Sequence, residues 1–105
     1  MELIGLRMRT GEDVCGELVD STDSTVTLRR PLVPITRPET DNSGNQTGRE
    51  VLHFIKWMPF AVEEEFAIFK DTFVCEPYSL PKEIEDAYLE VTSSIRLAKP
   101  GQMPK

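Results

Sequence analysis

The sequence predicts a mainly β domain in which five short antiparallel strands are followed by a single helix. Two patterns favour this class. Short runs of alternating apolar and polar residues are separated by polar turns, which is typical of half-buried strands. A later segment repeats its apolar residues at helical spacing. The chain has 105 residues, of which 39% are hydrophobic. We therefore expect one domain with a small core, which gains stability from a helix laid over the sheet or from a neighbouring subunit.

The first three predicted strands lie close together in the sequence. In the first, Ile4, Leu6 and Met8 form an inner apolar face, and Gly11 supplies the backbone freedom of the turn that follows. The next two repeat this alternation after further short polar turns. The three strands are residues 2–9, 14–20 and 25–30. Because such short connections join neighbouring strands, the pattern predicts an antiparallel meander.

The middle of the chain changes character. Several prolines precede a polar segment, 39–49, which we expect to be an exposed flexible loop. Residues 51–60 form the most apolar stretch and predict a fourth strand that is buried on both faces for part of its length. The prolines are Pro31, Pro34 and Pro38.

An acidic run, Glu63–Glu65, interrupts the fourth strand, and residues 66–69 resume its direction. A tight reversal at 70–72 then leads into the fifth strand, 73–76. The last two strands are short and apolar, so their unpaired edges would promote aggregation unless another strand paired with them.

Residues 79–99 predict an amphipathic helix. Ser79 can cap its N-terminus, and Pro81 is tolerated in the first turn. Acidic residues lie towards its start and basic residues towards its end, as the helix dipole favours. Its apolar stripe consists of Ile84, Ala87, Tyr88, Val91, Ile95 and Ala98. The predicted units are a β domain at 1–78, the helix at 79–99 and a tail at 100–105.

The charge balance limits any role in nucleic-acid binding. The formal net charge is −6, whereas proteins that hold nucleic acid mainly through its phosphates are basic. A local patch would have to carry such a role, and the arginines of the N-terminal third are the candidates. They are Arg7, Arg9, Arg29, Arg30 and Arg37. The alternative is that these are solvated strand residues paired with Glu12, Glu17 or Asp20.

The sequence offers no pattern typical of an enzyme, a cofactor or a metal site. Cys15 and Cys75 are too far apart for a zinc motif, and we expect two half-buried thiols in a reducing compartment. His53 lies in an apolar strand, which predicts a packed histidine. Glu63–Glu65 predict a solvated turn. Met1 is followed at once by strand sequence, and no apolar run approaches a membrane span. We therefore expect an intracellular protein with no membrane partner.

Two groups of residues resemble the Sm and Sm-like (Lsm, Hfq) family. Leu6, the run Gly11–Leu18, and then Asp23, Val26 and Leu28 are similar to the first Sm motif. Its second glycine, Gly16, suits a strongly bent strand in a small barrel. Phe69–Asp71, followed by Phe73 and Val74, is similar to part of the second motif, with Asp71 in place of the usual glycine.

The resemblance covers about residues 2–77. The stretch Trp57–Phe60, the acidic run Glu63–Glu65 and the helix after the last strand are similar to a divergent, phage-type subgroup. The resemblance implies a strongly bent five-stranded barrel in a cytoplasmic protein, encoded by a phage in a bacterial host. It also implies a homo-oligomeric ring of roughly five to seven copies, in which the fifth strand of one subunit pairs with the fourth of the next. The implied ring interface is Phe66, Ile68, Phe69, Phe73, Val74 and Trp57.

The resemblance further implies a site for single-stranded RNA in the ring pore. Its residues are Asp23, Ser24, Thr25 and Lys70, to which we add Arg29 and Arg30. The family's stacking aromatic or histidine and its asparagine are missing here, and Asp71 brings a negative charge. Two interpretations stay open: a module for RNA binding and RNA metabolism, or an architectural ring whose acidic helix face meets a protein partner. That face carries Glu83, Asp86 and Glu90.

Overall fold

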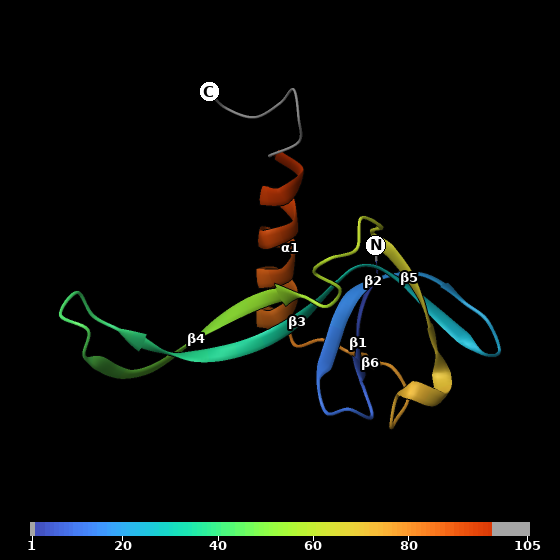
Figure 1. Ribbon diagram of the computed structural model, residues 1–105, viewed down its shortest axis with the longest axis horizontal. Helices are drawn as coiled ribbons and strands as arrows, with labels where there is room; N and C mark the ends of the chain where they lie inside the picture. Colours follow the sequence, from blue (N-terminus) through green and yellow to red (C-terminus); the bar gives the residue numbers. More distant parts are fainter. Residues whose placement is uncertain (1, 98–105) are drawn as a thin grey trace.

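The computed structural model describes residues 2–97, and of residues 94–97 it describes the backbone alone. The chain forms an antiparallel sheet and one C-terminal helix, as predicted (Figure 1). The helix is α1 (Lys82–Leu97), and a short 3-10 helix, η1 (Lys70–Thr72), follows the fifth strand. The strands are β1 (Leu3–Arg7), β2 (Asp13–Ser21), β3 (Thr25–Thr40), β4 (Gln46–Lys56), β5 (Glu65–Phe69) and β6 (Tyr78–Ser79). Their order is β4-β3-β2-β1-β6, with β5 paired to β3.

The three-stranded meander at the N-terminus is confirmed. β1 pairs with β2, and β2 pairs with the first half of β3. The alternating apolar residues of these strands meet on one side, where Leu6, Val14 and Leu28 are fully buried. Gly16 lies in the bent part of β2, and a Cβ there would lie 3.1 Å from the carbonyl oxygen of Arg29. The close approach of β3 therefore explains why this position suits glycine.

β3 changes partners at a kink. Its first half pairs with β2 and β5, and its second half pairs with β4. Between the two halves, Arg30 has a φ of 53°, the only positive φ at a non-glycine residue in the described chain. The buried hydroxyl of Tyr88 on α1 donates to the carbonyl oxygens of Arg29 and Arg30, at 3.1 and 2.9 Å. The helix therefore holds the unusual backbone of the kink in place.

The expected loop at 39–49 is mostly strand. β3 continues to Thr40 and β4 begins at Gln46, so the two strands form a long hairpin, here called the arm (residues 33–54), which extends from the body of the sheet (Figure 1). The arm tip is exposed, as expected. Prolines do not interrupt β3, and the register explains why. The N–H of Trp57 donates to the carbonyl of Pro31, so the odd-numbered residues of β3 bond to β4. The missing N–H groups of Pro34 and Pro38 therefore face away from β4.

The predicted fourth strand is present, but the prediction that residues 51–60 are buried on both faces for part of their length is wrong. β4 ends at Lys56, and His53 is exposed rather than packed. Ile55 is 47% exposed and Phe60 is 99% exposed. The reason is that β4 pairs only with β3 in an arm that stands away from the core. One residue of β4, Phe54, reaches the helix. Its ring packs edge to face on the ring of Tyr88, with 6.2 Å between the ring centres.

The sheet is not closed into a barrel. The predicted fifth strand, 73–76, contacts β1 through a single bridge between Met8 and Phe73. Around it, the N–H of Val74 donates to Arg7 at 3.0 Å, and the N–H of Arg9 donates to Thr72 at 2.8 Å. The chain then leaves β1 and returns as β6, which pairs with Ile4 and Gly5. An irregular crossing therefore replaces the expected closing strand.

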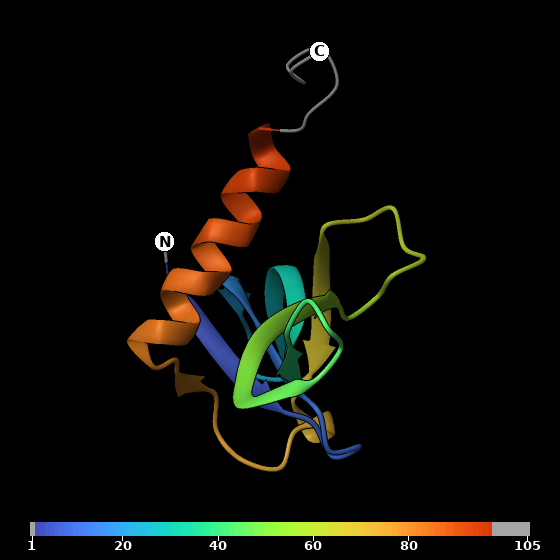
Figure 2. The same ribbon diagram turned by 90° about the vertical axis from the view of Figure 1, so that its left-hand side faces the viewer.

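α1 covers one side of the sheet, opposite the loop of residues 57–64 (Figure 2). It begins at Lys82 rather than at the expected residue 79, because Tyr78 and Ser79 are taken up by β6. Tyr88 is 1% exposed and Thr92 3%. The predicted apolar stripe faces the sheet as far as Val91, and Thr92 extends it. Ala98 and the tail at 100–105 lie outside the described residues. Tyr88 packs in a small core with Leu3, Cys15 and Leu32.

Candidate nucleic-acid interface and subunit edges

The two loops that the resemblance assigns to RNA lie side by side. The β2–β3 turn is held by the hydroxyl of Thr22, which accepts from the N–H groups of Ser24 and Thr25 at 3.3 and 3.0 Å. The N–H of Lys70 at the start of η1 donates to the carbonyl of Ser24 at 2.8 Å. The structure therefore brings Asp23, Ser24 and Thr25 next to Lys70.

The side chain of Lys70 is available to a ligand. It is exposed and has no ionic or hydrogen-bonding partner among the described residues. Arg9 approaches the same 3-10 helix, because its N–H bonds Thr72 and its guanidinium donates to the carbonyl of Asp71. Sequence patterns did not place Arg9 at this site, since the link depends on the long-range bridge between Met8 and Phe73. The local charge is mixed, because the carboxylates of Asp23 and Asp71 are exposed nearby.

Arg29 and Arg30 are not part of this cluster. Arg29 pairs with Glu65, whereas Thr25 pairs with Phe69 at the other end of the same ladder. Four residues of extended strand separate the two positions, which corresponds to about 13 Å. The candidate RNA-binding residues therefore form two separate groups.

The two arginines at the kink are neutralised by acids. Arg29 contacts Glu65 at 2.7 Å and Glu17 at 3.2 Å. Arg30 contacts Glu64 at 3.0 Å and Glu17 at 3.7 Å. The hydrogen bond and the charge of Glu65 raise the pKa of Arg29 above its usual value. Of the expected acidic partners, Glu17 is confirmed, whereas Glu64 and Glu65 were expected to form a solvated turn.

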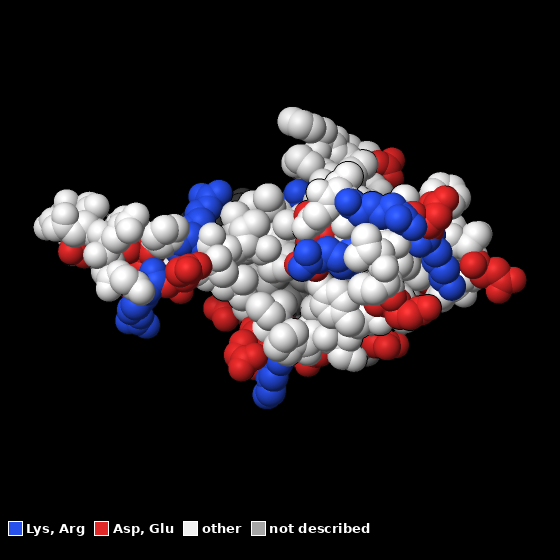
Figure 3. All heavy atoms as spheres, turned by 90° about the horizontal axis from the view of Figure 1, so that it is seen from below, with Lys and Arg blue, Asp and Glu red and all other residues white. Residues whose placement is uncertain are grey.

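The other basic residues do not form a continuous patch. Arg7 holds Asp13 with two hydrogen bonds of 2.8 and 3.0 Å, and the hydroxyl of Tyr78 donates to the same carboxylate at 2.9 Å. Arg37 lies on the exposed arm. Figure 3 shows basic and acidic side chains interspersed over the lower face of the molecule. The exposed cations near Lys70 are therefore the best candidates for a phosphate contact.

The predicted ring-interface residues divide into two groups. Ile68 and Phe73 are 4% and 7% exposed, within the core of the chain itself. Trp57 and Phe66 pack against that core and against each other, with ring centres 6.2 Å apart. Phe69 and Val74 are on the surface, at 62% and 55% exposure.

The outer edge of β5 has unpaired backbone groups. The N–H of Lys70 donates to Ser24, and the N–H of Arg30 donates to the carbonyl of Glu64 at 2.7 Å. Because bonded and non-bonded pairs alternate in an antiparallel ladder, the even-numbered residues of β5 bond to β3 and the odd-numbered ones face outwards. The outward residues are Glu65, Ala67 and Phe69, although the carbonyl of Phe69 already accepts from the hydroxyl of Thr72 at 2.6 Å. No described strand pairs with this edge.

A second open edge lies along residues 73–76. Apart from the bridge at Phe73 and the hydrogen bonds around it, no described strand runs beside this segment. Val74 exposes its side chain here, and Cys75 is exposed as a free thiol. These two short edges lie before and after η1, and among the described strands the outer edge of β4 in the arm is open as well.

Other chemistry is limited in the described part of the chain. The thiol of Cys15 is buried, and burial raises its pKa to about 12, which makes it a poor nucleophile. No group of three or more His, Cys, Asp or Glu residues among those described could hold a metal ion. Within residues 2–97, no helix has the length and apolar character of a membrane span.

Comparison with known proteins gives no family assignment. No protein-family model matches the chain, and a search of curated proteins finds no significant match.

Proposed function

We propose that this chain is a divergent Sm-like subunit, which assembles head to tail into a homo-oligomeric ring and binds single-stranded RNA through Lys70. The observation that carries the proposal is the pair of open backbone edges on either side of η1, namely the strand β5 and the irregular segment 73–76. The Sm-like resemblance assigns the same two segments to the contact between subunits. The proposal includes no catalytic role.

The edges support a ring for a physical reason. An exposed edge with unpaired N–H and C=O groups binds another strand unless it is covered. The two edges differ in sequence and belong to different segments, so pairing one with the other on the next copy is heterologous, and it closes as a ring when the rotation permits. Phe69 and Val74 would be buried by this pairing. We expect 73–76 to become a regular strand on assembly, which would complete an Sm-like barrel.

The RNA-binding part of the proposal depends on the contact between Lys70 and the β2–β3 turn. A ring would repeat this cluster once per subunit around the pore, so that several modest cationic contacts act on one strand. No aromatic residue lies in the turn or in η1 to stack on a base. Binding should therefore rely on phosphates and depend strongly on salt.

The competing interpretation is an architectural or protein-binding ring. The neutralised arginines at the kink favour it, because the salt bridges of Arg29 and Arg30 leave little positive charge for RNA. Of the acidic residues on α1, Glu83, Asp86 and Glu90 are all exposed, and Asp86 pairs with Lys82 at 3.3 Å. These residues would be the contact for a protein partner.

The ring is tested by the mass of the purified protein in light scattering. We expect a multiple of the 11.9 kDa chain and a marked loss of mass in Phe69→Arg, which places a charge on the open edge. Val19→Arg is the matched control, because Val19 is 40% exposed and lies on β2, which belongs to neither of the two segments. A monomeric wild-type protein would refute the ring.

RNA binding is tested on the same ring with labelled oligo-U and oligo-A at two salt concentrations. Lys70→Ala should weaken binding and reduce the salt dependence, whereas Lys82→Ala should change neither. A ring that carries no nucleic acid, and binds neither probe at low salt, would refute the RNA role and leave the architectural interpretation.

A further inference from the structure

The loop between β4 and β5 displays an apolar tip. The N–H of Ala61 donates to the carbonyl of Met58 at 3.2 Å, which closes a turn with Pro59 at its second position. Phe60 follows the proline and is 99% exposed, and Val62 is 90% exposed. Burying such a phenylalanine in a contact is favourable, because it removes a large apolar area from water. A closed turn therefore holds a large apolar side chain in solvent, with its backbone already ordered.

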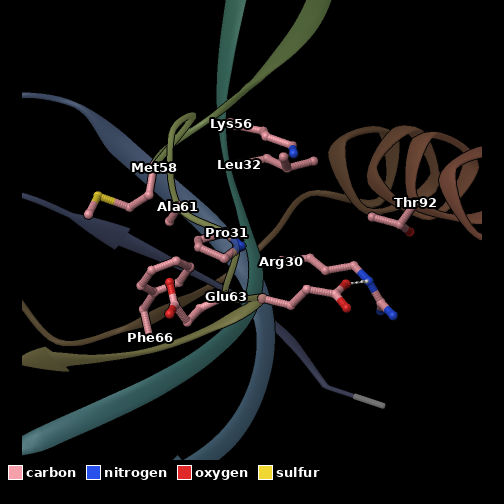
Figure 4. A pocket seen from close by; sticks show the side chains of 10 residues that line it. Arg30, Pro31, Leu32, Lys56, Met58, Ala61, Glu63, Phe66 and Thr92 are labelled. Carbon is pink, nitrogen blue, oxygen red and sulfur yellow. Dashed lines mark hydrogen bonds and ion pairs between the residues drawn. The ribbon is translucent and has the colours of Figure 1, made fainter.

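A small hollow lies at the base of the same loop. Its volume is about 90 Å³, and it opens to solvent. Met58 and Ala61 of the loop form one wall, with Pro31, Leu32 and Phe66 completing the apolar lining (Figure 4). A closed apolar cavity of about 150 Å³ holds a whole benzene molecule. An open hollow of 90 Å³ is therefore suited to the outer part of one phenyl ring.

The rim of the hollow has charges of both signs. Lys56, at the end of β4, lies on one side, and Glu63, in the loop, lies on another. Neither side chain has an ionic or hydrogen-bonding partner among the described residues. The rim can therefore pair with an identical copy of itself, Lys56 of one chain facing Glu63 of the other.

We propose that this patch is a two-fold contact between copies of the chain, in which Phe60 of each copy fills the hollow of the other. The tip lies in the same loop that supplies Met58, Ala61 and Glu63 to the hollow, so one surface patch holds both halves of the contact, as an isologous contact requires. This contact does not use the edges of β5 and 73–76, so it is independent of the ring. If a ring forms, the contact joins two rings, and if no ring forms, it joins two chains. The acids that follow the tip, Glu63–Glu65, oppose insertion into an anionic membrane.

The first test compares masses in solution by native mass spectrometry at a fixed chain concentration. Phe60→Ser should halve the mass, and it should fold normally because Phe60 makes no packing contact to lose. Ala61→Leu fills the hollow and leaves the tip intact, and it should also halve the mass. Val19→Ser is the control and should keep the wild-type mass. An unchanged mass in Phe60→Ser overturns the proposal.

A charge exchange tests the orientation of the two copies. Lys56→Glu and Glu63→Lys should each weaken the pairing, because each places like charges opposite each other. The double variant should restore it, because the pair is reversed but complementary. Failure of the double variant to regain the wild-type mass overturns the proposed contact.

The same measurement separates this contact from the ring. Phe69→Arg should reduce the assembly to pairs if both contacts exist, and Phe60→Ser should reduce it to single rings. A wild-type protein found only as a pair would refute the ring and support the two-fold contact. A single ring that Phe60→Ser does not alter would support the ring and refute the contact.

Discussion

The hydroxyl of Tyr88 is the most informative atom to remove, because it links the helix to the kink in β3. Tyr88→Phe deletes the donor that the carbonyl oxygens of Arg29 and Arg30 share, at 3.1 and 2.9 Å, and otherwise preserves the packing of the ring. A buried acceptor left without its donor costs about 1–3 kcal/mol. Since one proton serves both carbonyls, we expect a loss of about 1.5 kcal/mol in the free energy of unfolding. For a chain of this size, that lowers Tm by about 6–10 °C.

The assay is urea denaturation of wild-type and variant protein at the same chain concentration, because assembly would add to the apparent stability. Tyr78→Phe is the matched control. Its hydroxyl donates to Asp13, but the same carboxylate is also held by Arg7. We expect the control to lose less than about 1 kcal/mol, since the site is partly exposed. If Tyr88→Phe loses no more than the control, the helix does not hold the kink and the reasoning is wrong.

Two further predictions concern the buried thiol and the acidic partners of the arginines. Because burial raises the pKa of Cys15 to about 12 from its ordinary value of 9.0, the stability that it contributes should be fully present below pH 9 and decrease as the pH rises towards 12. Cys15→Ala should make the unfolding free energy from urea titrations less dependent on pH over this range, and a pH dependence equal to that of the wild type would refute this. Glu65→Gln should cost less than about 1 kcal/mol, because its salt bridge with Arg29 is partly exposed. It should also strengthen retention of oligo-U at low salt, because Arg29 would then keep only one acidic partner, Glu17. Unchanged retention would show that Arg29 does not reach the RNA.

The sequence predicted what depends on local pattern. The alternation in the first three strands and the helical spacing around Tyr88 both correspond to elements of the structure, because each sets one apolar face against the core. The position of Lys70 beside Ser24 was expected from the resemblance alone. The strand and helix predictions need no knowledge of distant partners, whereas the contact of Lys70 with Ser24 joins distant parts of the chain.

The remaining features depend on long-range pairing that a single sequence does not reveal. The third strand was predicted to end at residue 30, before the prolines, but the outward direction of the missing N–H groups of Pro34 and Pro38 depends on the register with β4. The apolar residues around His53 predicted burial, but the arm stands away from the core. Glu65 was predicted to lie in a solvated turn, because the sequence does not show that it pairs with Arg29 in the sheet.

The kink at Arg30 also bears on how the chain folds during synthesis. The hydroxyl that holds it belongs to a residue 58 positions downstream. The meander of β1, β2 and the first half of β3 is complete within the first third of the chain, so we expect it to pair as it leaves the ribosome. The arm, in contrast, lacks the hydrogen bonds from Tyr88 to the kink until α1 has emerged and docked. The helix nearest the C-terminus therefore fixes the direction of a strand that is synthesised much earlier. A nascent chain stalled before Tyr88 should contain a formed meander and an arm that the helix does not yet anchor.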